Sequence, residues 1–436
     1  MKTLLSALSL GVLAVGLAAQ ALVIDLADPP EGKAFTRVYG HGNTDDGRFG
    51  VPVCGGFDVD GDGYKDTAFA QFLGDPLGRA GAGIVTLVFG DGRVVDDLGG
   101  GSVQPIEKDA AAPRTDILHI AGALPSESTG SEIWMDDVNG DGFGDLLIAR
   151  QNFSHPTANP ARPGAGGLTI VFGSAGLRDL TALNTGSEQN YLDLSDVPPL
   201  ISTLTFVGPQ SYDRLGIWMR TGDITGDGVA DILVGTDEEG APGTSITNNS
   251  GACYVIRGGG HLANVSIPLA DLFEFGTASF PDVLKGHVAR ITPPLDSADY
   301  HFGGTVQVAD LDPNGRAEIL IAATLNRAGA GIRLPSAPSG TGEARGGSID
   351  GTVFILWDEN FPPTLWPEGY ALSVDASAPG DYTRIDGGSA NRSFGEELIG
   401  GLDYDGDGLP EFFAGDLVAS PLARSSAGEG YVFYAA

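Results

Sequence analysis

Aspartates recur at a fixed spacing in five short segments of the chain, and their side chains could hold metal ions. Each segment spans nine residues, with oxygen-bearing side chains at positions 1, 3, 5 and 9 and glycine at position 6. Calcium takes six to eight hard oxygen ligands at about 2.3–2.6 Å, so alternate side chains of a tight loop suit this ion. The segments, called loops 1 to 5, begin at Asp58, Asp137, Asp223, Asp310 and Asp403.

The expected ligands are the side chains at positions 1, 3, 5 and 9 and the backbone carbonyl at position 7 of each loop. Glycine at position 6 supplies the left-handed backbone that so tight a turn requires. In loops 1 to 3 these positions are Asp58, Asp60, Asp62, Tyr64, Asp66; Asp137, Asn139, Asp141, Phe143, Asp145; and Asp223, Thr225, Asp227, Val229, Asp231. In loops 4 and 5 they are Asp310, Asp312, Asn314, Arg316, Glu318; and Asp403, Asp405, Asp407, Leu409, Glu411.

The plain alternative is that these segments are Asp-Gly turns without an ion, since both residues are common in turns. Four carboxylates within loop 1 would repel each other without a cation, which favours bound calcium there. Loop 4 departs most from the pattern, because Pro313 replaces a glycine, Asn314 an aspartate, and Arg316 stands at position 7. We therefore expect up to five Ca²⁺ ions, with loop 4 binding weakly or remaining empty.

An EF-hand is excluded by the residue at position 12. The EF-hand requires a bidentate glutamate there and a helix on each side. Position 12 is apolar in all five loops and lies in a strand-like run: Phe69, Ile148, Val234, Ile321 and Ala414.

The composition points to an all-β protein. The 436 residues are 42% hydrophobic with 67 glycines, and short apolar runs alternate with Gly, Asp, Asn and Pro. A formal net charge of −33 argues against binding nucleic acid or an anionic membrane surface, since both need basic patches.

The N-terminus has the features of a secretory signal peptide. Lys2 precedes an apolar stretch over residues 4–17, and Ala19-Gln20-Ala21 is a small-x-small cleavage site. We expect a signal peptide over 1–21, one repeat domain over 22–436, and no transmembrane segment in the mature chain. The expected location is secreted, periplasmic or cell-surface. We expect Cys54 and Cys253 to be two buried free thiols rather than a disulfide.

Flanking strands repeat with the loops. A Phe-Gly-like pair precedes most loops, as at Phe49-Gly50, and Thr129-Gly130 stands in its place before loop 2. A Gly-x-x-Val-x-Phe strand follows, as at Gly83 to Phe89, and a fourth strand ends in glycine, as at Ile117 to Gly122. The fourth copy of that last strand, near Val283 to Ile291, is poorly defined.

The Phe-Gly pair, the aspartate loop and the Gly-x-x-Val-x-Phe strand together resemble the FG-GAP repeat of integrin α-subunits and of many secreted bacterial proteins. The resemblance implies a β-propeller of four-stranded blades with calcium in the loop after each first strand. Five repeats are visible, although seven blades with two cryptic ones remain an alternative, as in the integrin relatives.

The chain ends after the third strand of the last repeat, while Phe35 to Tyr39 resembles a fourth strand. We expect this N-terminal strand to complete the last blade and close the ring, which removes open edges. Long connections after each second strand would gather on the face opposite the calcium: Phe72 to Gly81, Gln151 to Gly164, Thr236 to Ser250 and Thr324 to Gly347.

No arrangement of residues predicts catalysis. The six histidines do not recur in register with the repeat, and no Gly-x-Ser-x-Gly or His-Glu-x-x-His motif occurs. We expect a non-enzymatic binding or adhesion module with an extracellular protein or glycan ligand and structural calcium. The alternatives are a propeller lyase or hydrolase that acts on polysaccharide in the central channel, and a purely structural envelope component.

Overall fold

The computed structural model describes twelve segments of the chain: residues 36–40, 48–90, 106–110, 114–182, 191–240, 250–264, 268–293, 300–324, 351–374, 382–387, 393–417 and 419–434. The predicted signal peptide lies outside them, as do much of 236–250 and nearly all of 324–347. The chain divides into two units, Met1–Val38 with Val94–Lys108, and Tyr39–Arg93 with Asp109–Ala436. The fold is all-β, as the sequence predicts, with 41% strand and 7% helix.

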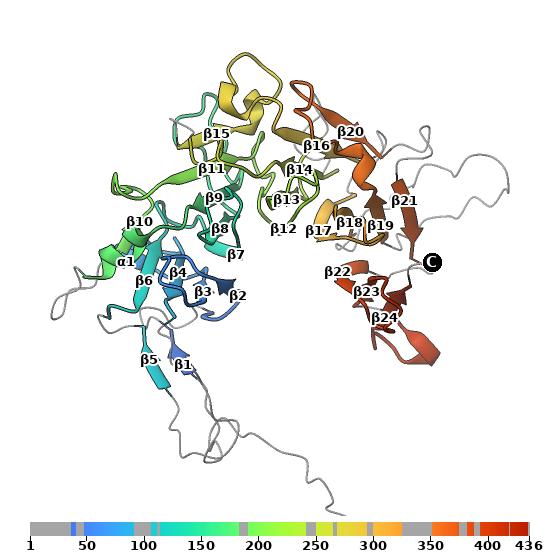
Figure 1. Cartoon of the computed structure of the whole chain (residues 1–436), viewed down its shortest axis with the longest axis horizontal. Coiled ribbons are helices and arrows are strands. Elements are labelled where there is room, and N and C mark those ends of the chain that lie inside the picture. The colour runs from blue at the N-terminus through green and yellow to red at the C-terminus, as the bar shows by residue number, and fades with distance from the viewer. Residues whose placement is uncertain are drawn as a thin grey trace, which may run out of the picture. The chain divides into compact units, whose positions relative to one another are not determined.

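The second unit contains five multi-stranded sheets, called sheets I to V, each of which carries one of the five loops (Figure 1). Sheet I consists of β2 (Val53–Phe57), β3 (Asp66–Gln71), β4 (Ile84–Val88), β6 (Ile117–Ala121) and β10 (Tyr191–Asp193). Sheet II consists of β7 (Thr129–Asp136), β8 (Asp145–Arg150), β9 (Gly167–Val171), β11 (Thr203–Val207) and β15 (Leu269–Asp271). Sheet III consists of β12 (Met219–Gly222), β13 (Asp231–Thr236), β14 (Ala252–Ile256), β16 (Val288–Thr292) and β20 (Ala371–Ser373). Sheet IV consists of β17 (Phe302–Ala309), β18 (Glu318–Ala323), β19 (Thr352–Leu356) and β21 (Tyr382–Asp386). Sheet V consists of β22 (Phe394–Leu402), β23 (Glu411–Asp416) and β24 (Glu429–Phe433).

The four predicted strands of a repeat appear in order in sheets I to IV, and each pairs antiparallel with the next. Every loop joins the first strand of its sheet to the second. The poorly defined fourth strand of sheet III is β16, which lies at the end of the predicted segment. Sheet V has three strands among the described residues.

A fifth strand, which the repeat pattern does not predict, lies on the outer edge of sheets I to III. Strands β10, β15 and β20 run parallel to β6, β11 and β16. Each comes from the connection between the third and fourth strands of the following sheet. The short apolar stretch around Leu192 therefore covers the edge of sheet I and ties it to sheet II, which protects an edge that could otherwise aggregate.

The predicted N-terminal strand is present as β1 (Thr36–Tyr39). It pairs with β5 (Ile106–Asp109) in a two-stranded sheet. The expected closure of sheet V by this strand stays a prediction.

Apolar clusters join each sheet to the next. Val85 and Leu87 of sheet I pack with Ile133 and Met135 of sheet II. Equivalent clusters join sheets II and III, III and IV, and IV and V. Because the strands of the inner sheets are buried on both faces, their apolar runs are continuous rather than alternating, and each sheet is held by its neighbours.

Helical structure is confined to connections. The α-helix α1 spans Ala175–Ala182, and short 3-10 helices occupy Pro76–Gly78, Leu272–Glu274, Asp282–Leu284, Asp358–Asn360 and Pro421–Ala423. Within the described residues, no helix has the length and apolar character needed to cross a bilayer. Cys54 and Cys253 are free thiols, as expected; Cys253 is buried and Cys54 is half-buried.

Candidate metal loops

All five loops adopt one backbone form. The glycine at position 6 is left-handed in each, with φ from 85° to 92°, as the calcium pattern requires. Its N–H donates to the carboxylate at position 1: Gly63 to Asp58 at 2.8 Å, and Gly142 to Asp137 at 2.9 Å. Because the same bond recurs at Gly228, Gly315 and Gly408, position 1 is held inside every loop.

Position 9 of loops 1 to 3 is a buried aspartate whose two oxygens both accept backbone N–H groups. In loop 2, Oδ2 of Asp145 accepts from Val138 at 3.0 Å and from Asn139 at 3.2 Å, and Oδ1 accepts from Gly173 at 2.9 Å. Gly173 lies two residues after the third strand, β9. The sequence predicts position 9 as a ligand, and the structure gives it a second task, tying the loop to its own sheet.

The same bonds recur in loops 1 and 3. Asp66 accepts from Val59 and Gly90 at 2.7 and 2.8 Å, and Asp231 accepts from Thr225 and Gly258, both at 2.8 Å. The residue that donates from the third strand is always glycine, and a Cβ on Gly258 would lie 2.3 Å from the carbonyl oxygen of Ala230. Glycine after the third strand thus accompanies aspartate at position 9.

Loops 4 and 5 have glutamate at position 9, and it is arranged differently. Oε2 of Glu318 accepts from Leu311 N–H, and Oε2 of Glu411 accepts from Tyr404 N–H, both at 2.6 Å. The other oxygen, Oε1, is buried in both residues and has no hydrogen-bond partner. A buried oxygen without a donor is costly unless a cation binds it, so both glutamates fit a metal ligand.

Three loops bring three carboxylates within reach of one ion. Ligand oxygens lie within 4.8 Å of one another in three sets: Asp58, Asp60 and Asp62; Asp310, Asp312 and Glu318; and Asp403, Asp405 and Glu411. Loop 4 therefore gathers its acidic side chains as loop 5 does, despite the sequence changes that predict weak binding there. Loops 2 and 3 have Asn139 and Thr225 at position 3, which are neutral oxygen donors.

Burial disfavours the charged form of several of these carboxylates. Burial first, and nearby loop carboxylates second, raise the pKa of Asp66 to about 6 and the pKa of Asp145, Asp231 and Glu318 to about 7. A cation would favour the ionised form and reverse these shifts.

Arginines offset part of the negative charge of loops 1 and 3. The sequence pattern does not predict these ion pairs. Arg178, on α1, lies 3.2 Å from Oδ2 of Asp60, and Arg257 lies 2.8 Å from Oδ2 of Asp227. Arg316 turns away from its own loop and pairs with Asp358 at 2.7 Å. Its guanidinium therefore pairs outside the carboxylates of loop 4.

Side chains at position 7 link successive loops. Position 4 of loops 1 to 3 is glycine, and the side chain at position 7 of the next loop lies against it. A Cβ on Gly61 would lie 2.3 Å from Phe143. A Cβ on Gly140 would lie 3.2 Å from Val229, and one on Gly226 would lie 2.6 Å from Arg316. The sequence predicts only the carbonyl of position 7 to be important. The structure adds that this side chain packs on the neighbouring loop, so glycine at position 4 is required for close contact as well as for its left-handed backbone.

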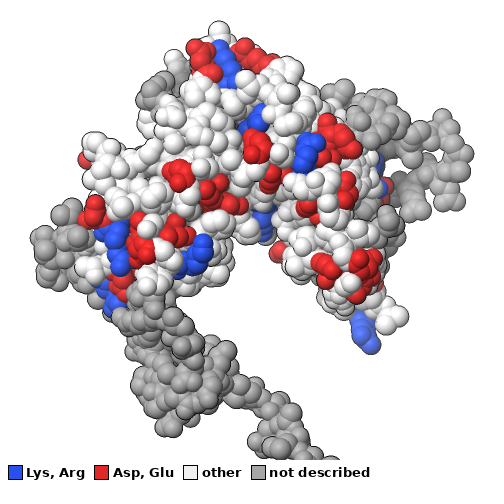
Figure 2. All heavy atoms as spheres, viewed as in Figure 1, with Lys and Arg blue, Asp and Glu red and all other residues white. Residues whose placement is uncertain are grey.

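The far ends of the sheets carry carboxylates of another kind, paired with arginines. Arg150 at the end of β8 pairs with Glu127 at 2.8 Å, and both side chains are buried. In sheet III the fully buried Glu239 accepts from Arg290 and from the hydroxyl of Tyr254. Figure 2 shows acidic patches on the visible face, several beside a Lys or Arg side chain.

No family model matches this sequence, and no curated protein matches it either. The resemblance to FG-GAP repeats therefore stays a prediction from the sequence motifs.

Proposed function

We propose that the chain is a calcium-stabilised FG-GAP propeller that acts outside the cytoplasm as a binding or adhesion module. The observation that carries the calcium assignment is the clustering of three carboxylates in loops 1, 4 and 5. Two of these clusters include a buried carboxylate oxygen without a hydrogen-bond donor. Oxygen-only donor sets around a flexible loop suit calcium better than softer metals.

The scarcity of basic residues supports a cation at these loops. The chain has 24 Lys and Arg against 57 Asp and Glu. Among the described residues, Asp310, Asp312, Asp403 and Asp405 make no ion pair, whereas Glu127 and Glu239 at the other sheet ends are held by arginines. An ion at each loop would supply the charge that arginine supplies elsewhere.

The experiment for this assignment is a calcium titration of chelator-treated protein, with magnesium as the competitor. Extracellular modules bind calcium with Kd of about 10⁻⁴–10⁻³ M, and we expect several sites in that range or tighter. The double variant Asp403→Asn with Asp405→Asn should remove one ion from the total. A control pair on an exposed surface, Asp282→Asn with Glu368→Gln, should leave the number of bound ions unchanged.

The binding function is supported by the separation of the two sheet ends. Calcium would hold the loop ends rigid, and the long connections at the other ends, 72–81 and 151–164 among them, are free to vary for recognition. Purified protein should be retained by an extracellular glycan or protein array in calcium, without conversion of the glycan. Release of shortened glycan would instead support the propeller lyase or hydrolase.

Strand order supports closure of the ring by β1 and β5. Strands β10, β15 and β20 each come from the connection between the third and fourth strands of one sheet and pair with the fourth strand of the preceding sheet. Strand β5 comes from the connection between the third and fourth strands of sheet I, and it pairs with β1. We infer that β1 is the fourth strand of a preceding sheet, and that this sheet is sheet V, which has three strands within the described residues.

Exposed apolar residues at the two terminal sheets agree with this closure. Val53 on β2 is 53% exposed and Ile399 on β22 is 53% exposed, whereas the equivalent first strands of sheets II and IV contain no exposed residue. Hydrogen exchange of calcium-loaded protein should show slow exchange at the outward-facing amides of β24, and Val38→Pro should abolish that protection. Fast exchange in the unmodified protein would contradict the closure.

A further inference from the structure

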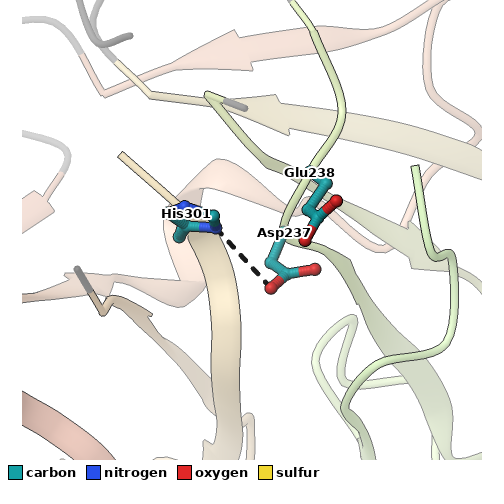
Figure 3. Close-up of side chains that lie close together, drawn as sticks. All are labelled: Asp237, Glu238 and His301. Atoms are coloured by element: carbon teal, nitrogen blue, oxygen red, sulfur yellow. Dashed lines mark ion pairs between the residues drawn. The ribbon is translucent and has the colours of Figure 1, made fainter. Parts of the chain in front are cut away.

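A cluster of mixed nitrogen and oxygen donors lies at the end of sheet III far from its calcium loop. Its members are Asp237 and Glu238, which directly follow β13, and His301, which directly precedes β17 (Figure 3). One donor atom from each lies within 4.8 Å of the others. Strand β13 begins at Asp231 of loop 3 and spans six residues, so about 20 Å of strand separates the cluster from that loop.

The carboxylate of Asp237 is buried without adequate partners. The residue is 8% exposed, and its Oδ1 atom has no hydrogen-bond partner. Oδ2 lies 3.7 Å from Nδ1 of His301 and 3.6 Å from Nη1 of Arg214, and both distances exceed those of a hydrogen bond. A buried charge arranged in this way costs stability unless another group binds it.

Arg214 pairs closely with only one of the two carboxylates of the cluster, that of Glu238. Its Nη1 donates to Oε1 of Glu238 at 2.7 Å. With the amide oxygen of Gln151 turned toward the guanidinium, Nε and Nη2 donate to Gln151 at 2.8 and 2.7 Å. Arg214 therefore fixes Glu238 and offsets one carboxylate, and the second carboxylate remains without a counter-charge when His301 is neutral.

We propose that Asp237, Glu238 and His301 bind a borderline divalent cation of the zinc class. Calcium takes oxygen ligands, whereas zinc takes imidazole nitrogen together with carboxylate oxygen. Zinc binds its ligand atoms at about 2.0–2.1 Å, so two ligand atoms of a tetrahedral zinc ion lie about 3.4 Å apart. Nδ1 of His301 and Oδ2 of Asp237 lie 3.7 Å apart, which is close to that separation. Three protein ligands leave one coordination position open, as in zinc sites that bind a water or an exogenous ligand.

The placement of this site gives it a role separate from the calcium loops. Asp237 and Glu238 begin the connection 236–250, one of those that the sequence predicts for recognition. An open metal position there would give the recognition end of the molecule a point of attachment for an anionic or imidazole-bearing ligand. His301 itself has a left-handed backbone, with φ of 51°, a conformation that asparagine tolerates well.

The test is titration of full-length protein with Zn²⁺ in saturating calcium, followed by calorimetry and native mass spectrometry. We expect one zinc ion to bind, with affinity at least about 10-fold lower in His301→Asn and in Asp237→Asn. His301→Asn keeps the backbone conformation, and the melting temperature in calcium reports whether each variant is folded. The bound calcium should be unchanged in both.

His261→Gln is the matched control, because His261 stacks on His287 with ring centroids 3.7 Å apart and could bind zinc independently. Zinc affinity should be retained in this variant. Loss of zinc binding in His261→Gln with retention in His301→Asn would overturn the proposal and place the ion at the stacked pair. Absence of zinc binding, or equal binding in all variants, would also overturn it.

Discussion

The two ends of each sheet manage negative charge in different ways. At the far end, Glu127 and Glu239 are buried against Arg150 and Arg290, so their charge is balanced by protein alone. At the loop end, carboxylates gather with few basic partners, and Asp403 and Asp405 lie together at the surface. The pairs Glu127–Arg150 and Glu239–Arg290 need no divalent cation, whereas we propose that bound cations stabilise the loop carboxylates and Asp237 at the far end of sheet III.

The largest expected effect comes from breaking the ion pair at the far end. Glu127 also accepts from Ala123 N–H and from the Thr129 hydroxyl, so Glu127→Ala leaves the buried guanidinium of Arg150 without its carboxylate and two donors without an acceptor. We expect a loss of about 4 kcal/mol in the free energy of unfolding, equal with and without calcium. Urea denaturation in calcium and in chelator measures both values. Asp282→Ala, which removes an exposed ion pair with Lys285, should have almost no effect.

A smaller loss is expected at position 9 of a loop. Asp145→Ala leaves three backbone N–H groups without acceptors and should cost about 3 kcal/mol, most of which persists in chelator. Asp141→Ala, at an exposed position of the same loop, should cost much less in chelator. If both variants lost stability only in calcium, position 9 would be a ligand without the structural task assigned to it.

At position 1 of loop 5 we expect a loss of stability that is larger in calcium than in chelator. Asp403→Ala should lower the free energy of unfolding by about 2 kcal/mol at about 2 mM calcium, if Kd is about 0.1 mM, because one stabilising ion is lost. In chelator the variant should lose only the two backbone hydrogen bonds from Gly406 and Gly408, both at exposed positions. Equal losses in the two buffers would show that no ion binds this loop.

A pH dependence of the loop end is also expected. The pKa of Asp66 is raised to about 6 and that of Asp145 to about 7, against about 3.9 in an unfolded chain. The folded, calcium-free protein therefore holds these protons more tightly. That contribution to stability is complete below pH 4 and is lost as the pH rises through 6 to 7.

Calcium-free protein should accordingly be less stable at pH 8 than at pH 5, and the gain from adding calcium should increase over the same interval. Unfolding free energies at both pH values, with and without calcium, measure this. The chain's overall negative charge also lowers the free energy of unfolding as the pH rises. The comparison therefore includes Asp66→Asn, in which the free energy of unfolding should depend less steeply on pH. A calcium gain that is the same at pH 5 and pH 8 would contradict the account.

Local patterns in the sequence predict much of the fold, because they are set by neighbouring residues. The left-handed glycines at position 6, such as Gly63, and the apolar strands that begin at position 9 are examples. The parallel strand β10 is not predicted, since three residues around Leu192 carry little signal and their partner, β6, lies far away in the chain. Repetition could have revealed it, because similar short stretches precede the fourth strands of sheets III and IV.

The sequence predicts the loop residues but not how each one is used. Aspartate and glutamate at position 9 appear equivalent in the motif, yet one extra methylene leaves Oε1 of Glu318 without a donor. A sequence signal accompanies this difference. Two residues after the third strand, sheets I to III have Gly90, Gly173 and Gly258, whereas sheet IV has Asp358. The cluster of Asp237 and His301 is beyond reach of any local pattern, because packing between sheets III and IV brings these residues together.

The most direct test of calcium binding at the loops is native mass spectrometry of chelator-treated protein during calcium addition, with the melting temperature followed in parallel. The account predicts that several calcium ions bind, that loops 4 and 5 are among the occupied sites, and that the melting temperature rises with each ion until saturation. Protein that binds no calcium at about 2 mM, with an unchanged melting temperature, would contradict it.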